Sequence, residues 1–401
     1  MWFHDIRHRL NRSRKVACFH TPSATSEMLG RDFTAESTAL AATPNNHPRL
    51  RPYQIEANTA VEQAIADRKR EMLLAMATGT GKTFTLVNQV YRLMKAGVAR
   101  RVLFLVDRRA LAAQAVRAFK SFEPEPALKF DQIYELYSQA FKRGDFDEDE
   151  AFDPTVLPAK YLLDPKPGHA FVYVCTIQRM AMNLFGRRAA ARAYGELESG
   201  DEDADRLDIP IHAIDLIVAD ECHRGYTSQE LSVWRDTLNH FDAIRIGLTA
   251  TPAAHTTSYF NAPIYRYEYE RAVREGHLVD YDVVKVKSDV RLKGIFLKEG
   301  EQVGTIDTDT GAEQLDLLED ERQFESEEVS RERCVTSPDS NRKIVEALRD
   351  HCAQHEQRYG RFPKTLIFAA HDIPHVSHAD QLVSLCRDVF GRGDAFVQKI
   401  T

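Results

Sequence analysis

The stretch from Met72 to Thr83, MLLAMATGTGKT, constrains the fold of this chain more than any other. Met72 to Met76 is an uncharged apolar run, long enough for a buried strand, and an apolar pattern at helical spacing resumes at Phe84. A strand, a glycine loop, Lys-Thr and a helix, in this order, are the parts of a phosphate-binding loop. The sequence therefore predicts such a loop, with a chance glycine-rich turn as the alternative.

The residues of the loop suit phosphate chemistry one by one. Glycine at positions 79 and 81 permits backbone conformations that a Cβ would forbid, so that several N–H groups can point at one anion. The start of the following helix adds free N–H groups and its positive dipole end. Lys82 can reach the β- and γ-phosphates of ATP, and the Thr83 hydroxyl can bind Mg²⁺. The predicted cofactor-binding residues are Thr78, Gly79, Thr80, Gly81, Lys82 and Thr83; Met76 departs from the pattern, which has Gly there.

Composition sets the broad class. A chain of 401 residues, 43% hydrophobic and 28% charged, is typical of a globular protein with two or three domains. It contains no run near the ~20 apolar residues of a membrane span. The six cysteines form no CxxC pair, which favours a reducing, cytoplasmic location and disfavours a zinc site. A net charge of −7 excludes a wholly cationic nucleic-acid wrapper, so that any such binding needs a local basic face.

Apolar runs recur beyond the loop, with helical patterns between them. We expect strands at residues 101–106, 170–174, 213–219 and 243–248. Strands that alternate with helices predict an α/β fold, a parallel sheet with helices on both faces. Ligands of such sheets collect at the carboxyl ends of the strands, so the polar residues that follow each strand are the candidates for a site.

Two adjacent carboxylates follow the strand expected at 213–219. Asp220 can hold Mg²⁺, and Glu221 can orient and deprotonate an attacking water, so that Lys82, Asp220 and Glu221 are the predicted catalytic residues. The alternative is a capping pair before the helix expected at 228–240. Thr249 and Thr251 follow the next strand and can bond His223 or a neighbouring backbone.

Other polar residues stand at similar positions, each with a plainer alternative. Gln54 can read an adenine edge through its amide, or it is a solvated helix residue. Arg108 and Arg109 can meet a phosphate chain, or they are solvated arginines at a helix start. Thr176 and Gln178 can bond a nucleic-acid backbone, or they cap the next helix.

The chain divides by composition into four segments. Residues 1–48 are expected to be a poorly ordered basic leader and linker, and residues 49–255 the first domain, with acidic insertions near 123–168 and 186–210. Residues 256–362 are a connecting segment with an acidic loop at 298–328, and 363–401 contain expected strands at 364–370 and 395–400. The bunched carboxylates of the acidic runs suit solvated loops better than metal sites.

Six motifs occur in one order: LRPYQ, ATGTGKT, FLVDRRAL, TIQ, DECH and LTATP. Together they resemble the DEAD/DEAH-type superfamily 2 helicases and translocases. The DECH form, the segment Tyr265 to Tyr281 and PKTLIFAAH at 363–371 resemble the motor of the restriction (R) subunit of type I restriction–modification enzymes.

This resemblance implies a RecA-like first domain that binds ATP and Mg²⁺, with Thr83 and Asp220 on the metal, and an incomplete second RecA-like domain at 363–401. It also implies that Gln54 contacts adenine and that Arg108, Arg109, Thr176 and Gln178 contact double-stranded DNA. His223, Thr249 and Thr251 would couple the ATP state to the DNA grip. Methylation and specificity subunits are the implied protein partners.

The sequence also departs from that family. We find neither its nuclease carboxylate cluster in residues 1–48 nor its QxxGRxxR arginine-finger motif, and Arg387 and Arg392 come too early to replace it. The resemblance therefore implies a motor truncated at both ends. The alternatives are a nucleotide-dependent DNA-binding remnant without turnover, and another DNA or RNA helicase of the same superfamily.

Overall fold

The computed structural model describes residues 1–7, 13–142, 154–194, 204–223, 227–286, 295–297, 302–306, 313–317, 322–324, 338–369 and 377–399. The chain forms two compact units, Met1–Asp280 and Tyr281–Thr401. The runs at 144–150 and 195–203, parts of the two predicted acidic insertions, lie outside the described residues.

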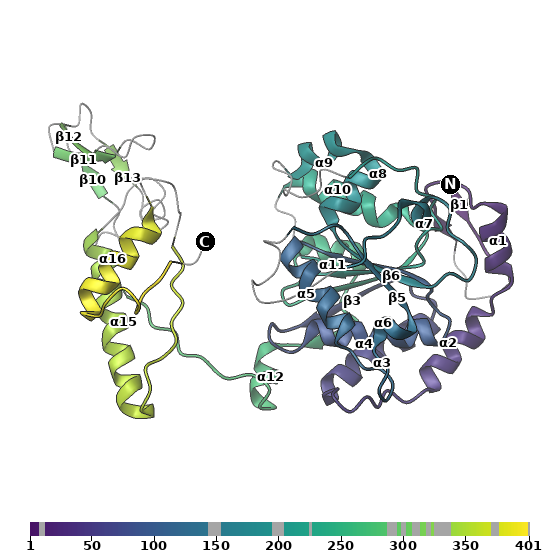
Figure 1. Ribbon diagram of the computed structural model, residues 1–401, viewed down its shortest axis with the longest axis horizontal. Coiled ribbons are helices and arrows are strands. Elements are labelled where there is room, and N and C mark those ends of the chain that lie inside the picture. Colours follow the sequence, from purple (N-terminus) through teal and green to yellow (C-terminus); the bar gives the residue numbers. More distant parts are fainter. Residues whose placement is uncertain are drawn as a thin grey trace. The chain divides into compact units, whose positions relative to one another are not determined.

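The first unit contains a seven-stranded sheet in the order β5-β6-β4-β7-β8-β3-β9, in which every neighbouring pair is parallel (Figure 1). The predicted parallel sheet is confirmed. Its strands are β3 (Glu71–Met76), β4 (Arg101–Val106), β5 (Glu135–Ser138), β6 (Phe171–Thr176), β7 (Leu216–Asp220), β8 (Ile244–Thr249) and β9 (Tyr265–Tyr267). A short antiparallel pair, β1 (Trp2–Phe3) and β2 (Arg14–Lys15), stands apart from it.

Both faces of the sheet are covered, which explains why its strands read as continuous apolar runs. In β3, Met72, Leu74 and Met76 belong to one core, shared with α3, α4 and α5, whereas Leu73 belongs to the other, shared with α8 and α10. The helices of the unit are α1 (Pro22–Leu29), α2 (Phe33–Ala42), α3 (Pro52–Ala66), α4 (Lys82–Lys95), α5 (Arg109–Lys120), α6 (Phe130–Ile133), α7 (Ala159–Leu163), α8 (Ile177–Phe185), α9 (Arg187–Tyr194), α10 (Ser228–His240), α11 (Ala254–Phe260) and α12 (Tyr269–Arg274).

A buried ion pair joins α3 to α4. The Arg92 guanidinium donates to both carboxylate oxygens of Glu62, through Nε at 2.6 Å and Nη2 at 2.9 Å. It also donates to the carbonyl oxygens of Thr43 at 2.7 Å and Pro44 at 2.9 Å, just beyond the end of α2. Glu62 is 3% exposed and Arg92 is 9% exposed, so this pair fixes three segments within the core.

The structure corrects the prediction that residues 1–48 are poorly ordered. They contain α1 and α2, and Leu40 of α2 enters the main core. Several charged residues of this stretch have partners in the body of the unit. Arg14 lies 2.6 Å from Asp242, and Glu27 lies 3.0 Å from Arg100. The sequence of this stretch does not indicate its order, because the partners of its charged residues are far away along the chain.

The second unit contains α15 (Pro338–Tyr359) and α16 (His378–Phe390), close to the predicted helices. Two antiparallel pairs occur in the region of the predicted acidic loop, β10 (Ile295–Leu297) with β13 (Arg322–Phe324) and β11 (Gln302–Ile306) with β12 (Glu313–Leu317). The strands expected at 364–370 and 395–400 are not strands within the described residues 364–369 and 395–399. Leu366, Ile367 and Phe368 are exposed there, so the apolar run has no sheet to join among the described residues. In the part of the chain that is described, no helix is both long and apolar enough to cross a bilayer.

Gly247 in the middle of β8 is required by close packing. A Cβ at this position would lie 2.7 Å from a ring carbon of Phe260 and 2.9 Å from Sγ of Cys222. We expect Gly247→Ala to lower the free energy of unfolding by about 1 to 3 kcal/mol, the usual cost of overpacking a core. Urea unfolding of the variant measures this effect. Gly30→Ala is the control, since its nearest neighbour would be 3.5 Å away; equal stability of the two variants would contradict the prediction.

Candidate nucleotide-binding site

The loop after β3 is built around two glycines in the left-handed region. Gly79 has φ +83° and Gly81 has φ +77°. A Cβ at position 81 would lie 2.7 Å from Nε2 of Gln54, so both the conformation and the space require glycine. Helix α4 then starts at Lys82. Thr78 and Gly79 are exposed, Thr80 is buried and Thr83 is half-buried in the first turn of α4.

Lys82 pairs across the site with the residue that follows β7. Its Nζ lies 2.6 Å from Oε1 of Glu221, and 9% of the Lys82 side chain is exposed. Glu221 itself has φ +49°, a left-handed conformation that is uncommon for a residue with a side chain. The structure thus brings together two of the three predicted catalytic residues from the ends of β3 and β7.

The third predicted catalytic residue, Asp220, is the last residue of β7. Its Oδ1 accepts a hydrogen bond from the Glu221 backbone N–H at 2.9 Å. Burial, and secondly the charge of Glu221, raise the pKa of Asp220 to about 6, although Lys82 opposes the shift. A carboxylate held in this way is short of positive charge, which a divalent cation would supply.

The predicted coupling residues are also in contact. Nδ1 of His223 lies 2.8 Å from Oγ1 of Thr249 and 3.3 Å from Oε2 of Glu221. Oγ1 of Thr249 accepts from the Thr251 backbone N–H at 3.1 Å. A continuous chain of polar contacts therefore runs from Lys82 through Glu221 and His223 to the end of β8.

Gln54 lies against the phosphate-binding loop. Its Nε2 donates to the carbonyl oxygens of Thr80 and Gly81, at 3.2 Å each, and its Oε1 accepts from the Arg51 N–H at 2.9 Å. The side chain is 3% exposed, so the alternative of a solvated glutamine is wrong. Its contact with adenine stays a prediction, because both amide hydrogens are used by the loop in this structure.

Two tyrosines that sequence reasoning missed also support the loop. The Tyr53 hydroxyl donates to the Thr80 carbonyl at 2.7 Å, and its ring stacks on Tyr267 of β9 with centroids 3.9 Å apart. The Tyr267 carbonyl accepts from the Ala77 N–H at 2.9 Å. The signal was present in LRPYQ and in the tyrosine-rich stretch 259–269, but aromatic residues alone do not show which contacts they make.

Of the four predicted DNA-contacting residues, two have side chains that reach the surface and two are buried. Arg108 has a side chain that is 65% exposed, and Gln178 is half-buried. Thr176 is fully buried, and its hydroxyl accepts from the Arg179 N–H as the cap of α8. Arg109 is 5% exposed and donates to the Ala140 carbonyl at 2.6 Å. In this structure, therefore, Thr176 has its plainer role as a helix cap. Arg109 is not the solvated arginine of the plainer alternative, since it is buried and bonded to the Ala140 carbonyl.

A metal ion would be held by few protein ligands. Among the described residues there is no group of three or more His, Cys, Asp or Glu side chains that could hold a metal. Mg²⁺ does not need one, because it commonly binds through one or two carboxylates together with substrate phosphates and water. The donor set of Thr83 and Asp220 suits that mode.

The raised pKa of Asp220 makes stability depend on pH. Between about pH 4 and pH 6 the folded protein keeps a proton that the unfolded chain has released, so stability falls as the pH rises through this window. We expect Asp220→Asn to raise the free energy of unfolding by about 1 to 3 kcal/mol at pH 7.5, with no gain at pH 4. Urea unfolding at both pH values tests this. Asp236→Asn, at an exposed position, is the control. If Asp220→Asn raised the free energy of unfolding equally at both pH values, the explanation would be refuted.

The parallel sheet, the glycine loop after β3 and the carboxylates at the end of β7 define a RecA-like P-loop fold. Residues 47–254 match the family described as "Type III restriction enzyme, res subunit". The chain belongs to this family, and it is similar in sequence to endonuclease subunits of type I restriction enzymes.

Two curated relatives come from Escherichia coli. The EcoKI endonuclease subunit of strain K12 is 32% identical over 97% of this chain and 30% of its own length. The EcoAI endonuclease subunit is 28% identical over 88% of this chain and 36% of its own length. The chain thus spans about a third of these relatives. A solved fragment from Vibrio vulnificus YJ016, described as an HsdR subunit, is 18% identical over 95% of this chain and 53% of its own, with a TM-score of 0.45 that is too low to define the fold.

Proposed function

We propose that this chain binds Mg²⁺-ATP at the loop after β3 and forms the part of a restriction subunit in which ATP hydrolysis drives DNA movement. The observation that supports this most is the polar chain from Lys82 through Glu221 and His223 to Thr249. It joins the ends of three strands, β3, β7 and β8, at one edge of the sheet.

The Lys82–Glu221 pair suggests how binding prepares the site. A phosphate that approaches the loop competes with Glu221 for the Lys82 ammonium group. Once Lys82 turns to the phosphates, the Glu221 carboxylate is free to orient a water and to accept its proton. His223 lies 3.3 Å from Glu221 and also contacts Thr249, so a movement of the Glu221 carboxylate would alter the contact between His223 and Thr249.

Bound Mg²⁺ would supply positive charge to the phosphate oxygens. Thr83 and Asp220 are the residues that would hold it. Asp220 has to lose its proton to do so, because only the ionised carboxylate is a strong ligand. The proposed roles of Lys82, Glu221 and Asp220 are therefore distinct.

For DNA, we propose Arg108 and Gln178 as the contacts, since their side chains reach the surface at the carboxyl ends of β4 and β6. Arg109 and Thr176 would act indirectly by holding the backbone in place. With a net charge of −7, binding to double-stranded DNA should be weak, non-specific and steeply salt-dependent. Sequence selection would then come from partner specificity and methylation subunits.

The test is phosphate release by the purified chain with and without duplex DNA, beside calorimetric binding of ATP. We expect Mg²⁺-dependent ATP binding, and stimulation of turnover by duplex DNA rather than by single-stranded RNA. The absence of ATP binding would refute the proposal. Binding without turnover would favour a nucleotide-dependent DNA-binding protein, and stimulation by RNA would favour another helicase of the superfamily.

A further inference from the structure

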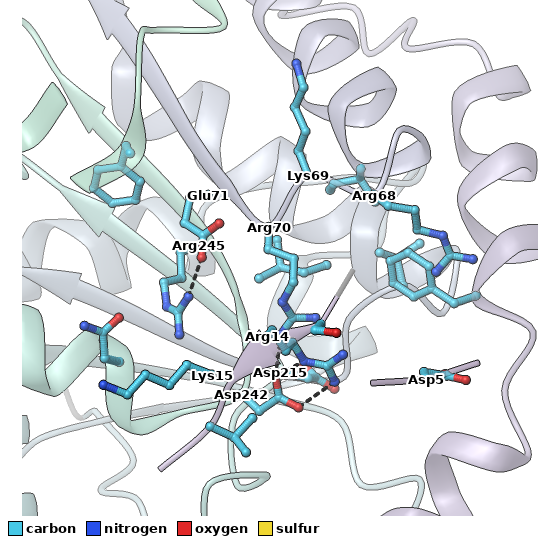
Figure 2. Close-up of a pocket in the computed structure, with 18 of the residues that line it drawn as sticks. Asp5, Arg14, Lys15, Arg68, Lys69, Arg70, Glu71, Asp215, Asp242 and Arg245 are labelled. Carbon is cyan, nitrogen blue, oxygen red and sulfur yellow. Dashed lines mark hydrogen bonds and ion pairs between the residues drawn. The ribbon is translucent and has the colours of Figure 1, made fainter. Parts of the chain in front are cut away.

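A cavity of about 1260 Å³ lies in the first unit, at the opposite edge of the sheet from the phosphate-binding loop. Its wall includes Arg70, Asp215 and Asp242, which precede β3, β7 and β8, and it is closed on another side by Arg14 and Lys15 of β2 (Figure 2). Because the strands are parallel, the amino ends that form this wall lie at the edge away from Lys82 and Glu221. The cavity is therefore separate from the nucleotide site.

Asp242 is the shared counter-ion of two arginines of this wall, Arg14 and Arg70. It accepts from Arg14 Nε at 2.6 Å, from Arg70 Nη2 at 2.8 Å, and it contacts His20 Nε2 at 2.8 Å. The Asp242 side chain is 4% exposed. One carboxylate carries one negative charge, so the two arginines alone leave an excess of positive charge at this point.

The rest of the lining does not cancel that excess. Among the described residues, eight arginine and lysine side chains line the cavity against six carboxylates. Arg31 also pairs with Glu36, outside the lining, at 3.2 Å, which leaves one positive charge over. Glu71 is paired with Arg245 at 2.7 Å, and Asp5 with Arg7 at 2.8 Å. Three lining cations have no carboxylate within 4 Å among the described residues: Lys15, Arg68 and Lys69.

The electrostatics of the wall agree with this count. Burial, opposed by Asp242 but assisted by Arg14 and Arg245, lowers the pKa of Arg70 to about 10. Burial alone would raise the pKa of Asp242, but the hydrogen bonds from His20 and Arg14 and the charge of Arg70 hold it well below its usual range. The Nε of Arg31, another lining residue, is buried without a hydrogen-bond partner. Arg14 and Arg70 thus share the single counter-charge of Asp242.

We propose that this cavity binds a phosphate group, either of a nucleic-acid backbone or of a free polyphosphate. A phosphate provides several anionic oxygens that can accept from guanidinium and ammonium groups together. The excess of positive charge suits such a group, as do the three lining cations that have no carboxylate within 4 Å among the described residues. Arg14 and Arg70 would form the floor of the site, and the exposed Lys15 and Lys69 would close on the ligand.

The experiment uses the whole chain with Lys82→Ala in every sample, so that the loop after β3 does not contribute. In that background, Lys15→Gln with Lys69→Gln is compared with Lys129→Gln with Lys160→Gln. All four lysines are exposed, the two pairs change the net charge equally, and the control lysines do not line the cavity. Thermal unfolding checks that both double variants fold equally well.

The first probe is tripolyphosphate, followed by calorimetry, and the second is a 20-bp duplex DNA, followed by fluorescence anisotropy at several salt concentrations. We expect the Lys15/Lys69 variant to bind at least one probe about 10-fold more weakly than the control variant. If the Lys15/Lys69 variant has a lower affinity for duplex DNA, and its affinity depends on salt with a slope smaller by about 1.8, the ligand is the nucleic-acid backbone. If only its affinity for tripolyphosphate is lower, the ligand is a free polyphosphate. Equal affinities of the two double variants for both probes would overturn the proposal.

Discussion

Lys82→Ala is expected to weaken the binding of Mg²⁺-ATP by about 30- to 150-fold, which corresponds to about 2 to 3 kcal/mol. The Lys82 ammonium group stands at the first turn of α4, beside the left-handed Gly81, and 9% of its side chain is exposed. Hydrogen bonds between charged groups in such partly dry sites are stronger than those at the surface. Calorimetry with ATP, or titration with a fluorescent analogue, measures the change.

Two further variants sharpen this experiment. Lys95→Ala, in the last turn of the same helix and 59% exposed, should leave the affinity unchanged. Glu221→Gln removes the carboxylate that pairs with Lys82 in this structure, so it should leave binding intact or tighten it while abolishing turnover. Equal ATP affinity for the wild type and Lys82→Ala would refute the phosphate-binding loop.

Glu62→Ala is expected to lower the free energy of unfolding by about 3 to 5 kcal/mol, because it leaves the buried Arg92 without its counter-charge. Arg92 would keep its bonds to the carbonyl oxygens of Thr43 and Pro44, but these carry only partial charge. Urea unfolding, followed by the fluorescence of the buried Trp234 in the same unit, measures the loss.

Glu56→Ala is the matched control. It lies on the same helix and also pairs with an arginine, Arg271 at 3.0 Å, but its side chain is 47% exposed. Surface pairs of this kind contribute about 0 to 1 kcal/mol. If Glu62→Ala lowered the free energy of unfolding no more than Glu56→Ala does, the Arg92 network would not be a major source of stability.

Much of the fold could be predicted from the sequence because strands buried on both faces are continuous apolar runs. The strand expected at 101–106 has the bounds of β4, and the run Met72 to Met76 starts one residue after β3 does. The same reasoning failed at Leu366 to Phe368, since an apolar run becomes a strand only where a neighbouring strand accepts its hydrogen bonds. Pairing is a property of distant segments and cannot be read from one of them.

The candidate site shows the same limit at the level of side chains. The positions of Lys82 and Glu221 followed from strand ends, but their mutual contact at 2.6 Å did not. Thr176 was equally consistent with a DNA contact and with a helix cap, and only its complete burial decides for the cap. Residue type and position limit the possible roles, whereas burial and the available partners select one of them.

The order of the strands has a consequence for how this protein is made. β3 pairs only with β8 and β9, although both are synthesised long after it. At about 5 to 20 residues per second, a ribosome needs about 10 to 30 s to extend the chain from Met76 to Ile244. During this time β3 lacks both of its neighbours in the sheet, so its apolar side chains cannot be buried between strands until β8 emerges.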